Sequence, residues 1–294
     1  MQKLFKLILF FLGLVSLDFL VSQSDLAKNK HNYLLGYENF YSFAKETKGQ
    51  KRIILVGGSA QSWGVSAKEL SKELNVLTLN SGIHAGIGWP NYFDTIKQVI
   101  NKEKDILIFS PEYDDMSQNE SLFRSKEYCE IMVSVIRNYP IRCIGYSLNK
   151  VFRVTPIIKK RNKTYFRSGF NKYGDYVYRE NGVFYQPDTC SIKISHSTLT
   201  SKYLPYLNNL KKKGYKIFYI PTIVAKGCAD LEDLKKFHNE IFNQFGLKGF
   251  NNAKLELDKK YFYNNPYHLT KKGVKEKTLE FKKQLQALLF FENK

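Results

Sequence analysis

The chain has 294 residues and 43% of them are hydrophobic, so it can bury the core of one sizeable domain and is not a disordered polymer. Its formal net charge of +19 would suit an anionic partner. The lysines are scattered rather than gathered into a stripe, and no nucleic-acid-binding motif is present. We therefore expect no nucleic-acid partner.

Residues 1–23 have the pattern of a membrane anchor or a signal segment. An apolar run from Leu7 to Leu17 follows two lysines, and Asp18 separates it from a further apolar patch. Basic residues before such a run favour an N-terminus in the cytoplasm, and no small-x-small cleavage site follows. We expect a membrane anchor, formed by an N-terminal transmembrane helix, with the domain outside the cytoplasm in the cell envelope. A cleaved signal is the alternative.

The polar residues 24–50 predict a stalk, and residues 51–294 a single domain. In that domain apolar strands alternate with amphipathic helices. The expected elements are, in chain order, a strand in "KRIILV", a helix in "VSAKELSKEL", a strand in "NVLTLN", a helix in "GWPNYFDTIKQVINKEK", a strand in "DILIF", a helix over 120–138, a helix over 198–213, a strand in "KIFYIP", a helix over 229–245, a strand in "AKLEL" and a helix over 270–289.

This alternation predicts an α/β fold in which helices cover both faces of a mainly parallel, five-stranded sheet. Residues from about 145 to 195 break the pattern. They are rich in Tyr, Phe, Arg and Gly and carry the turn signals "NKYGDY" and "RENGV", which predict an inserted hairpin or two. Its aromatic side chains either stack on sugar rings or fill a small core of their own.

The four cysteines are Cys129, Cys143, Cys190 and Cys228. None belongs to a CxxC pair, so we expect no zinc site and no other metal or cofactor. Outside the cytoplasm these cysteines can form two disulfides in any of three pairings. Four buried free thiols are the alternative.

Ser59 lies in "GGSAQSWG", between the first strand and the first helix of the domain. The preceding glycines let the backbone turn sharply, and the helix N-terminus supplies N–H groups. A serine placed there can act as a nucleophile whose own N–H helps to hold an oxyanion. A simple helix cap is the alternative role for Ser59.

Two further stretches meet Ser59 at the edge formed by the C-terminal ends of parallel strands. "NSGIHAGIG" follows the second strand and brings Gly82 and His84 to this edge. "NNPYHLTKKG" places His268 on a loop before the last helix, where Thr270 is a plausible cap. A histidine on such a loop is a candidate general base.

These three blocks, in this order, resemble the SGNH (GDSL-like) hydrolase superfamily over residues 53–110 and 216–290. The resemblance implies a flavodoxin-like three-layer fold, with Ser59 as nucleophile and His268 as base. It also implies that the N–H groups of Ser59 and Gly82 help to form an oxyanion hole. The chain looks most like membrane-anchored members that accompany the acylation of surface polysaccharide or teichoic acid.

Two positions depart from the family pattern. The family carries an oxyanion-donating Asn after the third strand, where this chain has "SPEYDD". A carboxylate of Glu112 pointing inward would repel an oxyanion, whereas the hydroxyl of Tyr113 would donate to it. The family also places Asp three residues before the histidine, where this chain has Asn265, which we take as the third catalytic position.

We therefore expect a serine-dependent acyl esterase or acyltransferase that acts on an acyl group, O-acetyl in the first instance, of a cell-surface glycan. Trp63, His84 and Glu112 are the expected substrate-binding residues. The expected partners are the acylated polysaccharide, the membrane and a membrane-bound acyltransferase. The alternative is a degenerate SGNH-like protein that binds a glycan or assists that acyltransferase. A cytosolic thioesterase or lipase-like enzyme is a third class.

Overall fold

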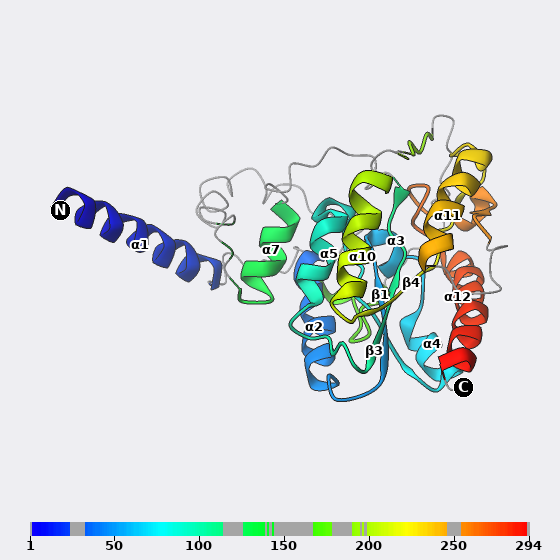
Figure 1. Ribbon diagram of the computed structural model, residues 1–294, viewed down its shortest axis with the longest axis horizontal. Coiled ribbons are helices and arrows are strands. Elements are labelled where there is room, and N and C mark those ends of the chain that lie inside the picture. Colours follow the sequence, from blue (N-terminus) through cyan, green and yellow to red (C-terminus); the bar gives the residue numbers. More distant parts are fainter. Residues whose placement is uncertain are drawn as a thin grey trace.

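The fold is that of a computed structural model. It describes residues 2–23, 33–113, 126–138, 140, 143, 167–177, 190–194, 196, 199–245 and 254–292. The domain is α/β, as the alternation of strands and helices predicts, with a parallel sheet between helices (Figure 1).

The main sheet has four strands in the order β2-β1-β3-β4, and every neighbouring pair is parallel. The strands are β1 Arg52–Val56, β2 Leu77–Asn80, β3 Asp105–Phe109 and β4 Lys216–Tyr219. The expected fifth strand does not join this sheet. It is β6, Glu256–Leu257, which pairs with β5, Val224–Ala225, in a separate parallel ribbon.

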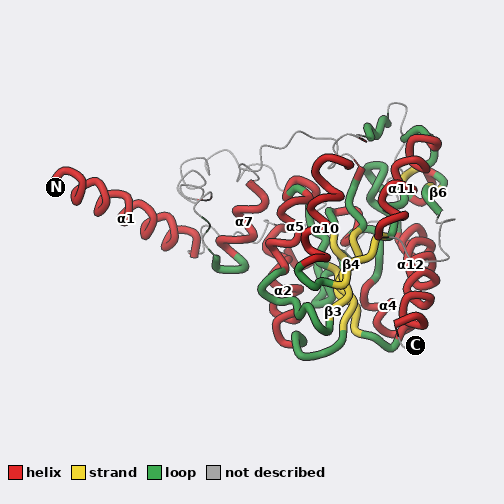
Figure 2. The backbone as a smooth tube through the Cα atoms, viewed as in Figure 1, coloured by secondary structure: helices red, strands yellow, loops and turns green. Residues whose placement is uncertain are grey.

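Helices cover both faces of the main sheet (Figure 2). Their bounds are α1 Gln2–Gln23, α2 Tyr37–Glu46, α3 Ser59–Ser62, α4 Ala67–Leu74, α5 Trp89–Ile96, α7 Lys126–Ser134, α10 Leu204–Lys212, α11 Leu231–Phe245 and α12 Lys271–Glu292. A π-helical turn, Leu199–Tyr203, leads directly into α10. Several helices are shorter than their sequence patterns predict, most clearly α5, and residues 120–125 of the expected helix over 120–138 lie outside the described part.

Alternate side chains of each strand enter opposite cores, since side chains in a strand alternate between the two faces. Ile53 and Leu55 pack with α4 and α12, whereas Ile54 and Val56 face the larger core that includes α2, α5 and α10. β1 and β3 are buried along their whole length, which explains their continuous apolar sequences.

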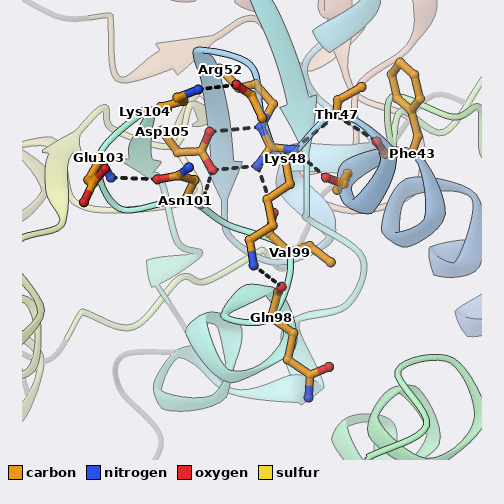
Figure 3. Close-up of polar contacts among 12 residues, drawn as sticks. Phe43, Thr47, Lys48, Arg52, Gln98, Val99, Asn101, Glu103, Lys104 and Asp105 are labelled. Carbon is orange, nitrogen blue, oxygen red and sulfur yellow. Dashed lines mark hydrogen bonds and ion pairs between the residues drawn. The ribbon is translucent and has the colours of Figure 1, made fainter.

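Residues 33–50 do not form the expected stalk, because α2 packs against the domain. Tyr37, Phe40 and Ala44 are buried in the larger core. Arg52, at the start of β1, ties this helix to the sheet (Figure 3). Its guanidinium pairs with Asp105 of β3, with Nη2 2.6 Å from Oδ2, and donates to the carbonyl oxygen of Ala44.

The described part of the insertion, residues 167–177, also packs on the domain. Tyr176 N–H donates to the carbonyl oxygen of Ser62, and Asn80 N–H donates to that of Tyr173. The carboxylate of Asp175 accepts the N–H groups of Ala67 and Lys68 and so caps α4. An isolated antiparallel bridge joins 170 to 176, and the other predicted hairpin residues lie outside the described part.

Two disulfides settle the alternatives for the cysteines. They join Cys129 to Cys143 and Cys190 to Cys228, and the described residues contain no free thiol. Disulfides form and persist in oxidising compartments.

The N-terminal segment is helical and most of its described apolar side chains are exposed. α1 extends away from the α/β domain (Figure 1), with Leu4, Phe10 and Leu20 among its exposed residues. Within the described residues, we find no helix whose length and apolar character suffice for crossing a bilayer.

Candidate functional site

The candidate site lies at the point where the strand order reverses, since β2 lies on one side of β1 and β3 lies on the other. In open parallel sheets such a point leaves a crevice beyond the C-terminal ends of the strands. Ser59 begins α3 three residues after β1 ends, and Glu112 follows β3 by the same interval. The topology therefore brings both residues to one place.

Glycines allow the turn that presents Ser59. A Cβ on Gly58 would lie 2.8 Å from Oε1 of Glu112 and 2.8 Å from the hydroxyl of Tyr92, and one on Gly57 would lie 2.6 Å from the carbonyl oxygen of Ser110. Larger residues would therefore push the neighbouring groups apart. Ser59 itself stays partly exposed, as a nucleophile requires.

Ser59 and His268 are hydrogen-bonded although 209 residues separate them. Oγ of Ser59 lies 2.9 Å from Nε2 of His268, within the range for proton transfer between a nucleophile and its base. A short antiparallel bridge between Phe262 and Leu269 holds the loop, and Tyr263 N–H donates to the carbonyl oxygen of His268. The imidazole, in a residue only 4% exposed, is thus fixed before α12 begins.

The residue that orients this imidazole is Asn264, not the expected Asn265. Oδ1 of Asn264 lies 2.9 Å from Nδ1 of His268. Oδ1 of Asn265 instead accepts the backbone N–H groups of Tyr267 and His268, each at 2.8 Å, which shapes the turn. The structure therefore corrects the assignment of Asn265, whose role here is to hold the loop.

Trp63 is not placed to line an open substrate site, since it is 1% exposed. Its indole stacks on the imidazole of His268, with the ring centroids 4.8 Å apart and the planes at 13°. The indole also stacks on the ring of Tyr176, with the ring centroids 4.0 Å apart. Trp63 therefore fixes the orientation of the imidazole, and its electron-rich face can attract an imidazolium formed during the reaction.

Glu112 points inward, which is the orientation in which its carboxylate would repel an oxyanion. Its Oε1 accepts Oγ–H of Ser59 at 3.0 Å and the N–H of Ala60 at 2.6 Å, and the residue is 5% exposed. An oxyanion formed by attack of Ser59 would need the Ala60 N–H, the donor that directly follows the nucleophile. The carboxylate therefore occupies the position that such an oxyanion would take.

Two expected oxyanion donors already have partners. The N–H of Gly82 donates to Oδ1 of Asn80 at 3.1 Å, and the buried hydroxyl of Tyr113 donates to the carbonyl oxygen of Thr222 at 2.9 Å. His84 lies beside this turn, where its Nδ1 accepts the N–H of Gly86 at 2.8 Å. The structure thus assigns these groups to loop geometry, and it places Ala60 N–H, missed in the sequence, at the site.

Lys277 is a second feature that sequence analysis missed. It belongs to α12, is fully buried, and its Nζ donates to the carbonyl oxygen of Ala60 at 3.0 Å. Burial lowers the pKa of Lys277 to about 7, while the charge of Glu112 acts in the opposite direction. The only signal in the sequence was its helical spacing with Val274 and Phe281, both of which are buried.

The carboxylates of Asp175 and Glu112 bond to groups other than the imidazole. Asp175 caps α4, and Glu112 contacts Ser59 rather than His268 in the hydrogen bonds described above. The segment "DD" at 114–115 lies outside the described residues. Among the described residues there is also no cluster of His, Cys, Asp and Glu that could bind a metal ion.

Comparison with known proteins adds no relative. No family model, curated protein or solved structure matches this chain. The features that bear on function are the hydrogen-bonded line Asn264–His268–Ser59 and Glu112, which faces Ser59.

Proposed function

We propose that the protein is a serine-dependent acyl esterase or acyltransferase of the SGNH type. The observation that carries this proposal is the hydrogen-bonded line from Asn264 through His268 to Ser59, at the C-terminal edge of a parallel sheet. A nucleophile, a base in contact with it and a third group behind the base form the general pattern of covalent acyl transfer.

The strand order supports the finer assignment of a flavodoxin-like fold. The order β2-β1-β3-β4 matches the first four strands of the doubly wound order 2-1-3-4-5, in which ligands bind beside β1 and β3. Ser59 and Glu112 follow these two strands. The sequence blocks around Ser59, Gly82 and His268 resemble the same superfamily, so motif and topology favour one proposal.

The chemistry follows from the geometry. Oγ of Ser59 bonds to the acyl carbon as its proton passes to Nε2 of His268, and the carbonyl electron pair moves onto oxygen. Collapse of this oxyanion expels the alcohol of the ester, which takes the proton from Nε2 and leaves Ser59 acylated. Water or a sugar hydroxyl then attacks the acyl carbon and gives its proton to Nε2. Collapse of the second oxyanion breaks the bond between the acyl carbon and Oγ, Oγ takes the proton back from Nε2, and a free acid or a new ester is released.

The proposal places this chemistry in the cell envelope, with an O-acyl group of a surface glycan as substrate and a membrane-bound acyltransferase as partner. The two disulfides support a compartment outside the cytoplasm. In this proposal the exposed apolar residues of α1 hold the domain at the membrane.

Arg167, from the insertion, pairs with Glu38 of α2 and so supports the packed insertion rather than an open sugar site.

A second candidate is a non-catalytic protein of the same fold that binds a glycan or assists an acyltransferase. Two observations favour it: the neutral amide of Asn264 cannot stabilise an imidazolium as a carboxylate does, and Glu112 occupies the oxyanion position. The catalytic proposal is preferred because the bond between Ser59 and His268 has the geometry of a working pair.

Turnover of 4-nitrophenyl acetate by the purified full chain tests the proposal. We expect Ser59→Ala and His268→Ala each to lower turnover by about 10³-fold or more, as the loss of a catalytic pair does. Ser201→Ala, which removes an exposed serine of the π-helical turn Leu199–Tyr203, is the matched control and measures the background reaction with surface lysines. Wild-type turnover in either site variant would favour the binding role.

A further inference from the structure

The hydrogen bonds around Ser59 define how protons are shared at the site. If Ser59 gives its one proton to Glu112, then Nε2 of His268 must donate to Oγ of Ser59. Nδ1 must likewise donate to Oδ1 of Asn264, since an amide oxygen only accepts. A histidine that donates from both nitrogens is an imidazolium. These three hydrogen bonds, from Ser59 to Glu112, from His268 to Ser59 and from His268 to Asn264, are therefore satisfied together when Glu112 and His268 are both charged.

That arrangement cannot perform the proposed attack. An imidazolium has no lone pair with which to take the proton of Ser59. The Ala60 N–H is also occupied by the carboxylate, and a second negative charge forming beside Glu112 would be repelled. The charged form of Glu112 thus opposes both the base and the oxyanion.

A neutral Glu112 reverses both effects. Its carboxylic acid no longer requires the proton of Ser59, so that proton can turn to Nε2 of a neutral His268. A neutral acid also binds the Ala60 N–H more weakly than a carboxylate does, so it can give up that N–H to the oxyanion and turn its own O–H beside it, at the position where the superfamily pattern has an amide. A carboxylic acid kept neutral by a buried site is an effective donor to an oxyanion.

We propose that Glu112 is a catalytic residue that works as a neutral acid donating to the oxyanion, and that its charged form holds the site closed. This inference rests on the proposed acyl transfer and adds its regulation by protons. Before substrate attack His268 gives one proton to solvent and Glu112 takes one from it, so the pair changes from two charged groups to two neutral ones with no net gain of protons. Glu112 then keeps its proton while the proton of Ser59 moves to His268.

The groups facing Glu112 come from four elements. Ser59 and Ala60 of α3 donate to it, and Lys277 of α12, which donates to the carbonyl oxygen of Ala60, interacts with it electrostatically. The hydroxyl of Tyr92, from α5, approaches the same point above Gly58. His268 approaches through Ser59. Lys277 favours the charged form of Glu112, so it is the residue that keeps the resting site closed.

The test is the pH dependence of the rate at which a fluorophosphonate probe labels Ser59 in the full chain. We expect a bell in the wild type, rising as His268 loses its proton and falling about tenfold per pH unit as Glu112 loses its own. Glu112→Gln should lack the falling limb and label at least tenfold faster than the wild type at pH 9. Glu112→Asn is the second neutral variant, and thermal unfolding verifies that both are folded.

Lys277→Gln is the control for the origin of the falling limb. Below about pH 7, where Lys277 carries its charge, loss of the ammonium makes Glu112 harder to deprotonate, so the falling limb should begin at higher pH. A limb that survives in Glu112→Gln, or slower labelling of that variant at every pH, overturns the role of Glu112 but leaves Ser59 as the nucleophile. An absence of labelling in all folded variants overturns the nucleophile and this inference together.

Discussion

Asn264 and His268 face each other across one turn of the loop before α12, with Oδ1 of Asn264 2.9 Å from Nδ1 of His268. The neutral amide orients the imidazole but does not stabilise its charged form. In a serine-protease triad, the change from Asp to Asn lowers kcat about 10⁴-fold. The neutral Asn264 therefore limits kcat, and one substitution at this position can raise it.

We expect Asn264→Asp to raise kcat for 4-nitrophenyl acetate by about tenfold or more, since a carboxylate there stabilises the imidazolium in the transition state. Asn265→Asp is the matched control. Asp at 265 keeps the oxygen that accepts the N–H groups of Tyr267 and His268 and lies off the imidazole, so kcat should stay within about twofold. An equal gain in both variants would contradict the assignment of Asn264.

Trp63 is expected to support the site in two ways. Trp63→Leu removes the wall on which the imidazole stacks and should cost roughly 3 kcal/mol of unfolding free energy. It should also lower kcat beyond this loss of stability, because the face that attracts the imidazolium is gone. Trp63→Phe keeps an aromatic face and should retain more activity than the Leu variant. Kinetics at a temperature where all variants are folded separates the two effects, and equal kcat values for Phe and Leu would argue against a role for the ring face.

His238 predicts a pH dependence of stability unrelated to the site. It is 2% exposed, neither ring nitrogen has a hydrogen-bond partner within the described structure, and burial lowers its pKa to about 4. Between the unfolded value of 6.5 and 4, the unfolded state binds the proton and the folded state does not, so stability falls as the pH drops through this window.

His238→Leu should remove that dependence. Urea unfolding at pH 7 and pH 5 should show a smaller loss of stability in the variant than in the wild type. The variant should also be more stable than the wild type by about 1–3 kcal/mol at pH 5, because two unpaired buried nitrogens are removed. Parallel loss in both proteins would show that His238 carries no buried penalty.

The buried pair of Arg52 and Asp105 is expected to hold α2 on the sheet. Arg52→Met leaves the carboxylate of Asp105 buried without its partner and should cost about 3–5 kcal/mol. The double variant Arg52→Met with Asp105→Leu should cost less than the sum of the two single changes, by at least about 1 kcal/mol. Additive losses in urea unfolding would contradict a direct coupling between the two side chains.

The buried strands of this fold could be predicted from the sequence more accurately than the ends of the helices and the packing of α2. β1 and β3 are continuous apolar runs because both faces of the sheet are covered, and such runs are easily recognised. α5 ends at Ile96, well before its apolar spacing does, because the chain then turns so that Asn101 N–H donates to Asp105. The packing of α2 is not evident in the sequence, because the core that buries Tyr37, Phe40 and Ala44 is formed by distant segments.

The site shows a similar division. Ser59 and His268 were recognisable because each lies at a strand or helix end with distinctive neighbours. The choice between Asn264 and Asn265 was not, since adjacent side chains of one loop point in different directions that only the folded loop defines. Lys277 and Ala60 escaped notice because a lysine on a helix and a backbone N–H carry no local signal of burial or contact.

Covalent labelling of Ser59 tests the central claim most directly. The purified full chain is treated with a fluorophosphonate probe near pH 7, and the modified residue is located by mass spectrometry. We expect labelling at Ser59 in the wild type, none in Ser59→Ala, and labelling slowed by at least about 10²-fold in His268→Ala, which lacks the base in contact with Oγ. Folded wild-type protein that stays unlabelled, or His268→Ala labelled as fast as the wild type, would contradict the account.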